Sequence, residues 1–433
     1  MQSPATDLVS FINSSPTAFH ATRNLAEGFL QKGFTEVLES QTWNLKPGGK
    51  YFVRRNESAL VAFVCGLKKP WEAGFRAMGA HTDSPALRVK PKGELLKEVY
   101  NSVRVELYGG PIVSTWLDRE LGLAGRVFAL QNGNVTSKLV NTNRPVAIVP
   151  NLAIHMNREV NKGFEYNPHN HLSAIFAASD APGKAGMLFD LLAEESGLPA
   201  SAIVDADLFF HDATPARLCG KNNDFIVAPR LDNLAMCHAI MNATQQTEDA
   251  HHTTMAFFFD NEETGSCTYQ GADSSFAAHI MERIVLSQKG DREEFLRSLA
   301  LSFLISADMA HALHPNFSEK HDEKYAPVIN AGPVIKQNGN NRYATTAETA
   351  AIFEGICKDV AVPVQRIINR ADVPCGSTIG PMSSAALSIR TVDIGNPMWA
   401  MHSARETAGT RDHELMIRAL SHFCSNKCSI ANS

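Results

Sequence analysis

The chain has 433 residues, which exceeds the usual size of one compact core and predicts two domains or one domain with a large insertion. Apolar residues make up 44% and charged residues 20%, as in ordinary globular proteins, and the formal net charge is −5. The sequence has no long basic block and no apolar run of about 18 residues, so it predicts neither a nucleic-acid partner nor a membrane span.

The N-terminal residues and the cysteines indicate a cellular compartment. The N-terminal residues, MQSPATDLVSFINSSP, lack the basic segment followed by an apolar core that marks a secretory signal. The eight cysteines are scattered and do not form the paired CxxC motifs of a structural zinc site. Because reduced, scattered cysteines are typical of cytosolic proteins, we expect a cytoplasmic location.

The first part of the chain predicts helices and then strands. Apolar residues recur at helical spacing in two short amphipathic segments of the first 35 residues: Leu8, Phe11 and Ile12, then Phe19, Leu25 and Phe29. Strand-like apolar runs follow at residues 51–54, 59–64 and 75–79.

The pattern of residue types changes between about residues 93 and 224. Short alternating segments at residues 103–107, 126–130 and 146–149 are separated by Gly, Pro and Asn, which predicts a β-rich unit. On both sides, longer helical segments alternate with compact apolar strands, as in α/β proteins. We therefore predict an α/β domain formed by residues 1–92 and 225–433 and interrupted by a β-rich domain at residues 93–224.

Polar motifs follow the predicted strands of the α/β domain. Residues 75–79 are followed by His81 and Asp83, residues 253–259 by Glu262 and Glu263, residues 300–307 by Asp308, and residues 389–394 precede the loop that carries His402. A further motif places Asp232 before an apolar helical stretch at residues 234–241. Since open α/β sheets bind ligands beyond the carboxyl ends of their strands, we expect these side chains to share one crevice.

The residue types in these motifs indicate metal chemistry. Two histidines and several carboxylates form an N/O ligand set that suits zinc, and also cobalt or manganese. Five ligands are too many for one catalytic zinc and fit two ions if one carboxylate bridges them. One carboxylate of the Glu262-Glu263 pair can bind metal while its neighbour moves protons. Asp83 fits a role behind His81, where it would fix the imidazole tautomer.

Eight motifs together carry a family resemblance: GAHTDSPALRVKP (79–91), PRLDNL (229–234), FFDNEETGS (258–266), SADMAHALHPNF (306–317), GPVIK (332–336), RYAT (342–345), PCGSTIGP (374–381) and AMHSARE (400–406). In this order they resemble the M18 family of metalloaminopeptidases, and in particular the aspartyl aminopeptidases. The resemblance implies a zinc-exopeptidase-like catalytic domain with a mixed sheet, and removal of single N-terminal residues from peptides with a preference for Asp and Glu.

The resemblance also implies a role for each motif residue. His81 and Asp308 complete one metal site, Glu263 and His402 complete the other, and Asp232 bridges two zinc ions. Glu262 is implied to be the general base and then the acid, and Asp83 is implied to orient His81. Lys336 is the candidate that meets the side-chain carboxylate of the substrate, and His314 is a candidate for the substrate pocket. Residues 376–380 either offer backbone N–H groups to an anion or simply turn into a helix.

The inserted domain of the family implies assembly. It resembles a β-rich arm that mediates dimer contact and covers a neighbouring active site, and His155 matches a histidine that enters the site of the partner subunit. Family members form closed homo-oligomers, commonly dodecamers built from dimers, which would limit access to short peptide substrates.

Other functions are compatible with the same residues. A carboxypeptidase, a deacylase or an aminopeptidase for neutral residues would use the same metal frame. A metal-bound scaffold or packaged cargo protein with a degenerate site is the non-enzymatic alternative, and it is disfavoured by the complete ligand set and the additional Glu262.

Overall fold

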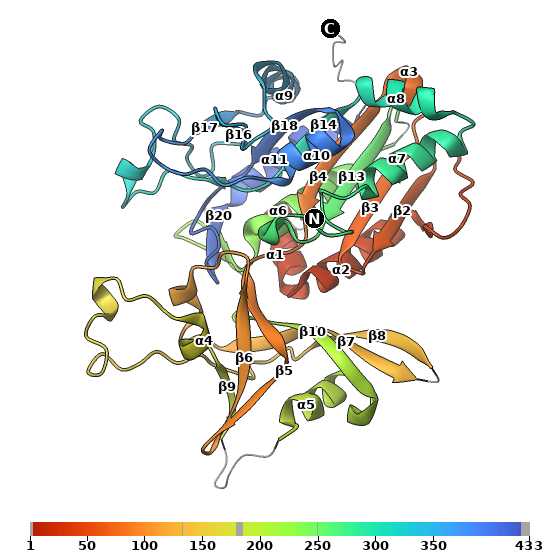
Figure 1. Cartoon of the computed structure of the whole chain (residues 1–433). Coiled ribbons are helices and arrows are strands. Elements are labelled where there is room, and N and C mark those ends of the chain that lie inside the picture. Colours follow the sequence, from red (N-terminus) through yellow and green to blue (C-terminus); the bar gives the residue numbers. More distant parts are fainter. Residues whose placement is uncertain (1–2, 132, 179–184, 249, 426–433) are drawn as a thin grey trace. The chain divides into compact units, whose positions relative to one another are not determined.

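The computed structural model describes residues 3–131, 133–178, 185–248 and 250–425 (Figure 1). The chain divides into two compact units. The first unit comprises Met1–Asp83, Arg217–Met401 and Glu406–Ser433, and the second comprises Ser84–Ala216 and His402–Arg405. The bounds predicted from the sequence pattern, residues 93 and 224, lie several residues later, and the strand that opens the second unit begins inside the 79–91 motif.

The first unit is built on a mixed sheet, which confirms the predicted α/β class. In sheet order its strands are β1 (Thr35–Glu36), β2 (Lys50–Arg55), β3 (Ala59–Val64), β13 (Thr253–Phe259), β4 (Phe75–His81), β14 (Phe303–Ala307), β18 (Arg390–Gly395), β16 (Val334–Gln337) and β17 (Gln365–Ile368). The four adjacent strands β13, β4, β14 and β18 are parallel, whereas β3 and β16 run antiparallel to them. The carboxyl ends of the four parallel strands therefore meet at one edge of the sheet.

The central strands are continuous apolar runs because helices cover both of their faces. In β13, Phe257 packs in a core cluster with residues of the following helix α7, while the neighbouring Phe258 faces Phe29 at a ring distance of 6.1 Å. Both rings are fully buried. Strands buried on both faces lose the alternation of half-exposed strands, which is why the sequence shows unbroken runs there.

The two N-terminal amphipathic helices are confirmed. The helices of the first unit are α1 (Pro4–Ser14), α2 (Ala18–Gln31), α3 (Pro70–Ala73), α6 (Leu231–Gln245), α7 (Phe276–Ser287), α8 (Arg292–Ala300), α9 (Ala347–Asp359), α10 (Ile379–Leu387) and α11 (Thr410–Cys424), with short 3-10 turns η4 (Glu262–Thr264) and η5 (Ser318–Lys320). The side chain of Ser3 caps α1 by accepting from the amide of Thr6. No helix in the described ranges combines the length and apolar content that crossing a membrane requires.

A smaller sheet also belongs to the first unit. In sheet order its strands are β11 (Arg217–Cys219), β12 (Phe225–Ala228), β20 (Glu406–Gly409), β19 (Pro397–Trp399) and β15 (Ala310–His311). Strand β19 lies between β18 and His402, so His402 does not follow the 389–394 strand directly. The predicted strand at 300–307 is likewise shorter, because Ala300 is the last residue of α8.

The second unit is β-rich. In sheet order its strands are β8 (Asn134–Asn141), β7 (Leu121–Gln131), β10 (Ile203–Asp212), β5 (Ala86–Lys97), β6 (Tyr100–Tyr108) and β9 (Ala174–Ala178); its helices are α4 (Pro168–His171) and α5 (Met187–Ser196), with turns η1 (Val113–Trp116), η2 (Val160–Lys162) and η3 (Ala200–Ala202). The prediction of a strand at residues 146–149 is wrong. Ala147 and Ile148 form isolated bridges to Leu121 and Ile175, so this segment links two strands without becoming one.

Candidate metal centre

The carboxyl edge of the parallel strands gathers the predicted side chains. His81 is the last residue of β4 and lies opposite Phe259, the last residue of β13. On the other side of β4, Ser306 pairs with Gly79, so Asp308 stands level with His81. The sheet register therefore brings together three motifs that are far apart in the sequence.

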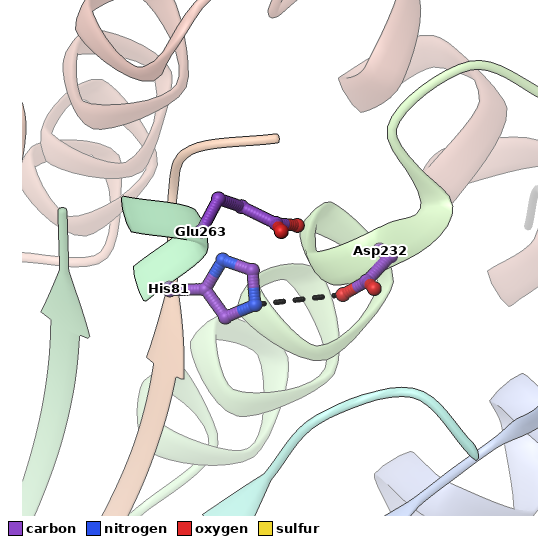
Figure 2. Close-up of side chains that lie close together, drawn as sticks. All are labelled: His81, Asp232 and Glu263. Atoms are coloured by element: carbon purple, nitrogen blue, oxygen red, sulfur yellow. Dashed lines mark ion pairs between the residues drawn. The ribbon is translucent and has the colours of Figure 1, made fainter. Parts of the chain in front are cut away.

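Three buried or half-buried donors form the centre of this cluster: His81, Asp232 and Glu263 (Figure 2). One ligand atom from each lies within 4.8 Å of the others. The Nε2 atom of His81 is 3.4 Å from Asp232 Oδ1. The three side chains come from β4, α6 and η4 and point toward one another, as donors to one cation do.

Local backbone geometry directs Asp232 into the cluster. Arg230, with φ of 58°, occupies the N-cap position of α6, and Asp232 has an extended backbone with φ −82° and ψ 106°. Its amide donates to Glu406 Oε2 at 3.1 Å, and the side chain of Asn233 donates to the carbonyl of Ala307 at 2.9 Å. The start of α6 is thus tied to β20 and β14.

Asp308 lies between His81 and a buried lysine. Its Oδ1 is 3.8 Å from His81 Nε2, and its Oδ2 is 3.4 Å from Lys336 Nζ. The ammonium group of Lys336 lies 5.3 Å from the ring centroid of Tyr343. Lys336 is only 3% exposed, so its charge depends on these neighbours instead of water.

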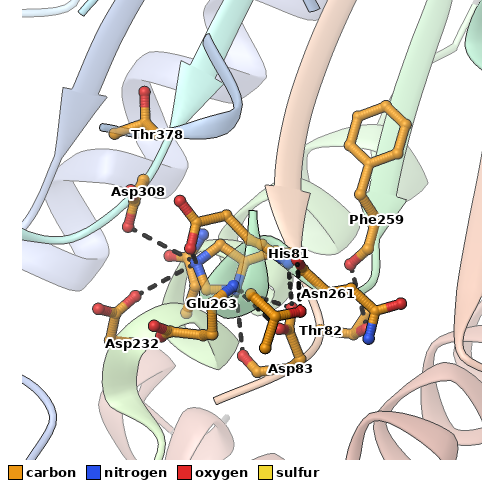
Figure 3. Close-up of polar contacts among 12 residues, drawn as sticks. His81, Thr82, Asp83, Asp232, Phe259, Asn261, Glu263, Asp308 and Thr378 are labelled. Carbon is orange, nitrogen blue, oxygen red and sulfur yellow. Dashed lines mark hydrogen bonds and ion pairs between the residues drawn. The ribbon is translucent and has the colours of Figure 1, made fainter. Parts of the chain in front are cut away.

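Asp83 makes more contacts than its predicted role behind His81 requires (Figure 3). Its Oδ1 is 3.3 Å from His81 Nδ1, and its carbonyl oxygen is 3.1 Å from the same atom. Its two carboxylate oxygens also accept from the amides of Glu262 and Glu263, each at 3.1 Å. One buried carboxylate therefore fixes both the imidazole and the turn that carries the glutamate pair.

The electrostatics of the cluster reflect crowded carboxylates. Burial, together with the negative charges of Asp308 and Asp83, raises the pKa of Glu262 to about 8 against the opposing effect of His81. Burial and the neighbouring Asp232 hold the pKa of Glu263 well above its ordinary value. Burial disfavours the charged form of His81, yet hydrogen bonds with the surrounding aspartates outweigh it and raise the pKa of the imidazole. Such a concentration of carboxylates favours the binding of a cation, which would stabilise their ionised forms.

The donor set fits zinc. An imidazole nitrogen and carboxylate oxygens are common zinc ligands, and the residues that carry them are largely removed from solvent. His81, Asp232, Glu263 and Asp308 would hold the metal, and Glu262, whose Oε2 is 3.9 Å from His81 Nε2, lies beside them.

Three predicted residues have other surroundings. His402 belongs to the second unit, where its Nδ1 is 3.0 Å from the carbonyl oxygen of Gly110. His155 is exposed in a turn of the second unit. His314 packs against the rings of Phe317 and Trp399 at 5.0 and 6.4 Å. Metal binding by His402 and substrate binding by the other two stay predictions.

Sequence reasoning missed two residues that support the cluster. Glu406 is buried and accepts from Asp232, and the thiol of Cys237 on α6 donates to the carbonyl of His81 at 3.0 Å. The position of Glu406 at the start of a strand, within the 400–406 motif, was a usable signal. Cys237 gave none, since it lies in an apolar helical stretch where small thiols are common.

Comparisons with known proteins identify the family of the chain. Residues 11–424 match the family model described as aminopeptidase I zinc metalloprotease (M18). A probable M18 family aminopeptidase 2 from Pseudomonas savastanoi pv. phaseolicola is 45% identical over 96% of both chains. One from Clostridium acetobutylicum is also 45% identical, over 97% of this chain and 98% of the relative.

Solved structures are similar as well. Ape4, determined in a complex with Nbr1, matches with a TM-score of 0.94 and 38% identity over 99% of this chain and 87% of its own. An M18 aminopeptidase from Thermotoga maritima has a TM-score of 0.86 at 21% identity, covers 97% of this chain and 95% of its own, and shares the fold. With the family model spanning almost all of the sequence and relatives 45% identical along it, the chain belongs to the M18 family of zinc metalloaminopeptidases.

Proposed function

We propose that the chain is a dinuclear zinc aminopeptidase that removes acidic residues from the N-termini of peptides. The observation that carries the proposal is the convergence of His81, Asp232, Glu263 and Asp308 on one spot, with Glu262 beside them. Cobalt or manganese would suit the same donors.

In this proposal, His81 and Asp308 hold one zinc ion and Glu263 and His402 the other. Asp232 is the bridging carboxylate, which is supported by its contact with His81 and its shared cluster with Glu263. The role of His402 rests on the family motif. Zinc bound here would polarise the scissile carbonyl and lower the pKa of the attacking water.

Glu262 would move the proton. It takes a proton from the attacking water and passes it to the leaving amine, which needs a carboxylate with a pKa near the working pH. Burial, which raises the pKa of Glu262 to about 8, supports this role, and the positive charge of bound zinc would bring that pKa down. Asp83 would keep Glu262 in place through its hydrogen bond to the Glu262 amide.

Lys336 is the proposed receptor for an acidic side chain. Its ammonium group has three donors, so it can contact Asp308 and still donate to a substrate carboxylate. The same ion pair favours a second candidate, an aminopeptidase for neutral residues on the same frame, because a lysine fully engaged by Asp308 would not receive the substrate.

The second unit is the proposed inserted dimerisation and lid domain, predicted for residues 93–224. Exposed apolar side chains flank His155: Leu152, Ile154 and Met156 are 53%, 46% and 69% exposed. Such a segment suits contact with another subunit. mApe1 of S. cerevisiae, which matches with a TM-score of 0.83 and 27% identity over 97% of this chain and 95% of its own, is a dodecamer. We propose a homo-oligomer built from dimers, in which His155 enters the site of the partner subunit.

The proposed function is tested by hydrolysis of aminoacyl-nitroanilides and short peptides with free or acetylated N-termini, by zinc-loaded protein with and without a chelator. Chelator-sensitive release of N-terminal Asp and Glu, with neutral residues much slower, is expected. Faster release of neutral residues would replace the acidic preference by the second candidate. Absence of release from any free N-terminus would refute the aminopeptidase and return attention to the deacylase and scaffold alternatives.

A further inference from the structure

Asp393 is an ionisable residue in the interior of the first unit. It lies in β18 between Val392 and Ile394, and none of its surface is exposed. A carboxylate at such a place is costly unless it is hydrogen-bonded or paired with a cation. Neither the metal ligands nor the proton transfer described above uses it.

The side chain of Asp393 anchors two loops, residues 342–345 and 374–378, which we call the pocket loops. The hydroxyl of Thr378 donates to Oδ1 at 2.7 Å, and the amide of Ala344 donates to Oδ2 at 2.6 Å. The Asp393 amide donates to the hydroxyl of Thr345 at 2.8 Å. A bond from the Ser377 hydroxyl to the carbonyl of Arg342 at 3.3 Å joins the loops to each other.

Gly380 makes this anchoring possible. It lies in the first turn of α10, and a Cβ atom there would overlap both carboxylate oxygens of Asp393. Its amide donates to the Thr378 hydroxyl at 3.2 Å, so the loop turns into a helix that Thr378 caps. Of the two readings of residues 376–380, the helix start is confirmed.

Asp393 also faces Lys336. Strands β16 and β18 are antiparallel with Ile335 opposite Ile394, so the next pair in the register is Lys336 and Asp393. Directly opposite residues point to the same face with Cβ atoms about 4.5–5.5 Å apart. Burial raises the pKa of Asp393, while hydrogen bonds with Ser306, Thr378 and Ala344 and the charge of Lys336 favour its ionised form.

Lys336 is thereby surrounded by Asp308, Asp393 and the ring of Tyr343, which is itself part of a pocket loop. Two carboxylates, those of Asp308 and Asp393, attract its ammonium group. A lysine held in this way is not committed to Asp308 alone, so one donor can stay directed toward a substrate.

We propose that Asp393 is a positioning residue for the substrate's N-terminal side chain: it anchors both pocket loops and holds Lys336 in the orientation that receives an acidic group. The proposal rests on the proposed function, because it assigns Lys336 to the substrate carboxylate. Asp393 acts through Lys336, Ala344, Thr345 and Thr378 and not by contact with the substrate.

The test uses full-length, zinc-loaded protein and four variants. Asp393→Asn removes the charge and keeps the shape, and Thr378→Val removes the donor to Oδ1. Thr378→Ser keeps that hydroxyl. Asp412→Asn is the matched control, because Asp412 is also fully buried and accepts from two backbone amides, those of Asn330 and Gly332 at 2.6 and 2.8 Å.

Two readouts are measured: the ratio of kcat/KM for aspartyl- and leucyl-nitroanilide, and amide hydrogen exchange in the pocket loops. Asp393→Asn and Thr378→Val are expected to lower the ratio about tenfold or more, as for loss of a charge-assisted hydrogen bond. They should leave leucyl turnover within about threefold and speed exchange in both loops. Thr378→Ser and Asp412→Asn should retain the wild-type ratio, since global destabilisation lowers both substrates equally.

The outcomes separate this proposal from the proposed function. If wild-type protein prefers leucyl over aspartyl substrate, the acidic preference fails, and with it the assignment of Lys336. An unchanged ratio together with unchanged exchange in Asp393→Asn and Thr378→Val would overturn the positioning role while leaving the acidic preference intact. A ratio that falls equally in Asp412→Asn would overturn it as well.

Discussion

Replacing Asp83 with asparagine is expected to weaken both zinc binding and catalysis. The carboxylate of Asp83 accepts from the amides of Glu262 and Glu263 at 3.1 Å each, and its Oδ1 lies 3.3 Å from His81 Nδ1. Asparagine offers one acceptor oxygen, so its NH2 group must face either the amide of Glu263 or both the imidazole and the amide of Glu262. A donor then meets a donor in a site where Asp83 is only 4% exposed.

The magnitude follows from these contacts. Loss of one hydrogen bond to a charged group costs about 1.5–3 kcal/mol. At about 1.36 kcal/mol per factor of ten, this corresponds to a roughly 10- to 150-fold decrease in kcat/KM if the displaced residue is Glu262. Disturbing the partner of a ligating histidine lowers metal affinity by about 10- to 100-fold.

The assay measures zinc affinity by competition with a fluorescent chelator, and kcat/KM at saturating zinc. Asp260→Asn is the matched control. Asp260 directly follows β13 and is buried, and its Oδ1 accepts from the amide of Asn261 at 2.8 Å. Burial, together with the charge of Asp83, raises its pKa to about 7, so a neutral amide resembles its protonated form. We expect the control to stay within about threefold of wild type. Unchanged zinc affinity and kcat/KM in Asp83→Asn, or an equal loss in Asp260→Asn, would refute the role of Asp83 as a clamp.

Glu262→Gln should keep its zinc, measured by elemental analysis, and lose about 10²- to 10⁴-fold in kcat; wild-type kcat would rule out the general base. Lys336→Met should reduce kcat/KM for acidic N-terminal residues by about 10- to 100-fold with little effect on neutral ones, and an equal effect on both would assign Lys336 to Asp308 instead. His402→Ala should lower bound zinc from two ions per subunit to one, and two ions would exclude it as a ligand. Burial raises the pKa of Asp412 to about 6 from 3.8, so the folded state holds its proton more tightly and stability falls as pH rises through that range. Urea unfolding in the presence of chelator measures the free energy of unfolding of wild type and of Asp412→Asn. The wild-type value minus the variant value should decrease by on the order of 3 kcal/mol between pH 4 and pH 7, and a constant difference would contradict the pKa shift.

The sequence by itself determined the elements whose local pattern matches their surroundings. Residues 253–259 are apolar at every position but the two threonines, and they form a strand that is buried on both faces. Leu8, Phe11 and Ile12 recur at helical spacing, and they form the buried face of a helix. The motifs at the ends of β4, β13 and β14 correctly indicated that their side chains lie close together, because parallel neighbours end at one edge.

Only the tertiary structure decided which partners these residues have. The two hydrogen bonds that the glutamate turn donates to Asp83, the contact of Glu406 with Asp232 and the ion pair of Lys336 with Asp308 each join residues more than 25 positions apart. The segment 146–149 alternates as a strand does, yet it forms only isolated bridges, from Ala147 to Leu121 and from Ile148 to Ile175. Local propensity describes what a segment can form, whereas strand register and buried hydrogen bonds arise when distant segments pack, and they set the geometry of the site.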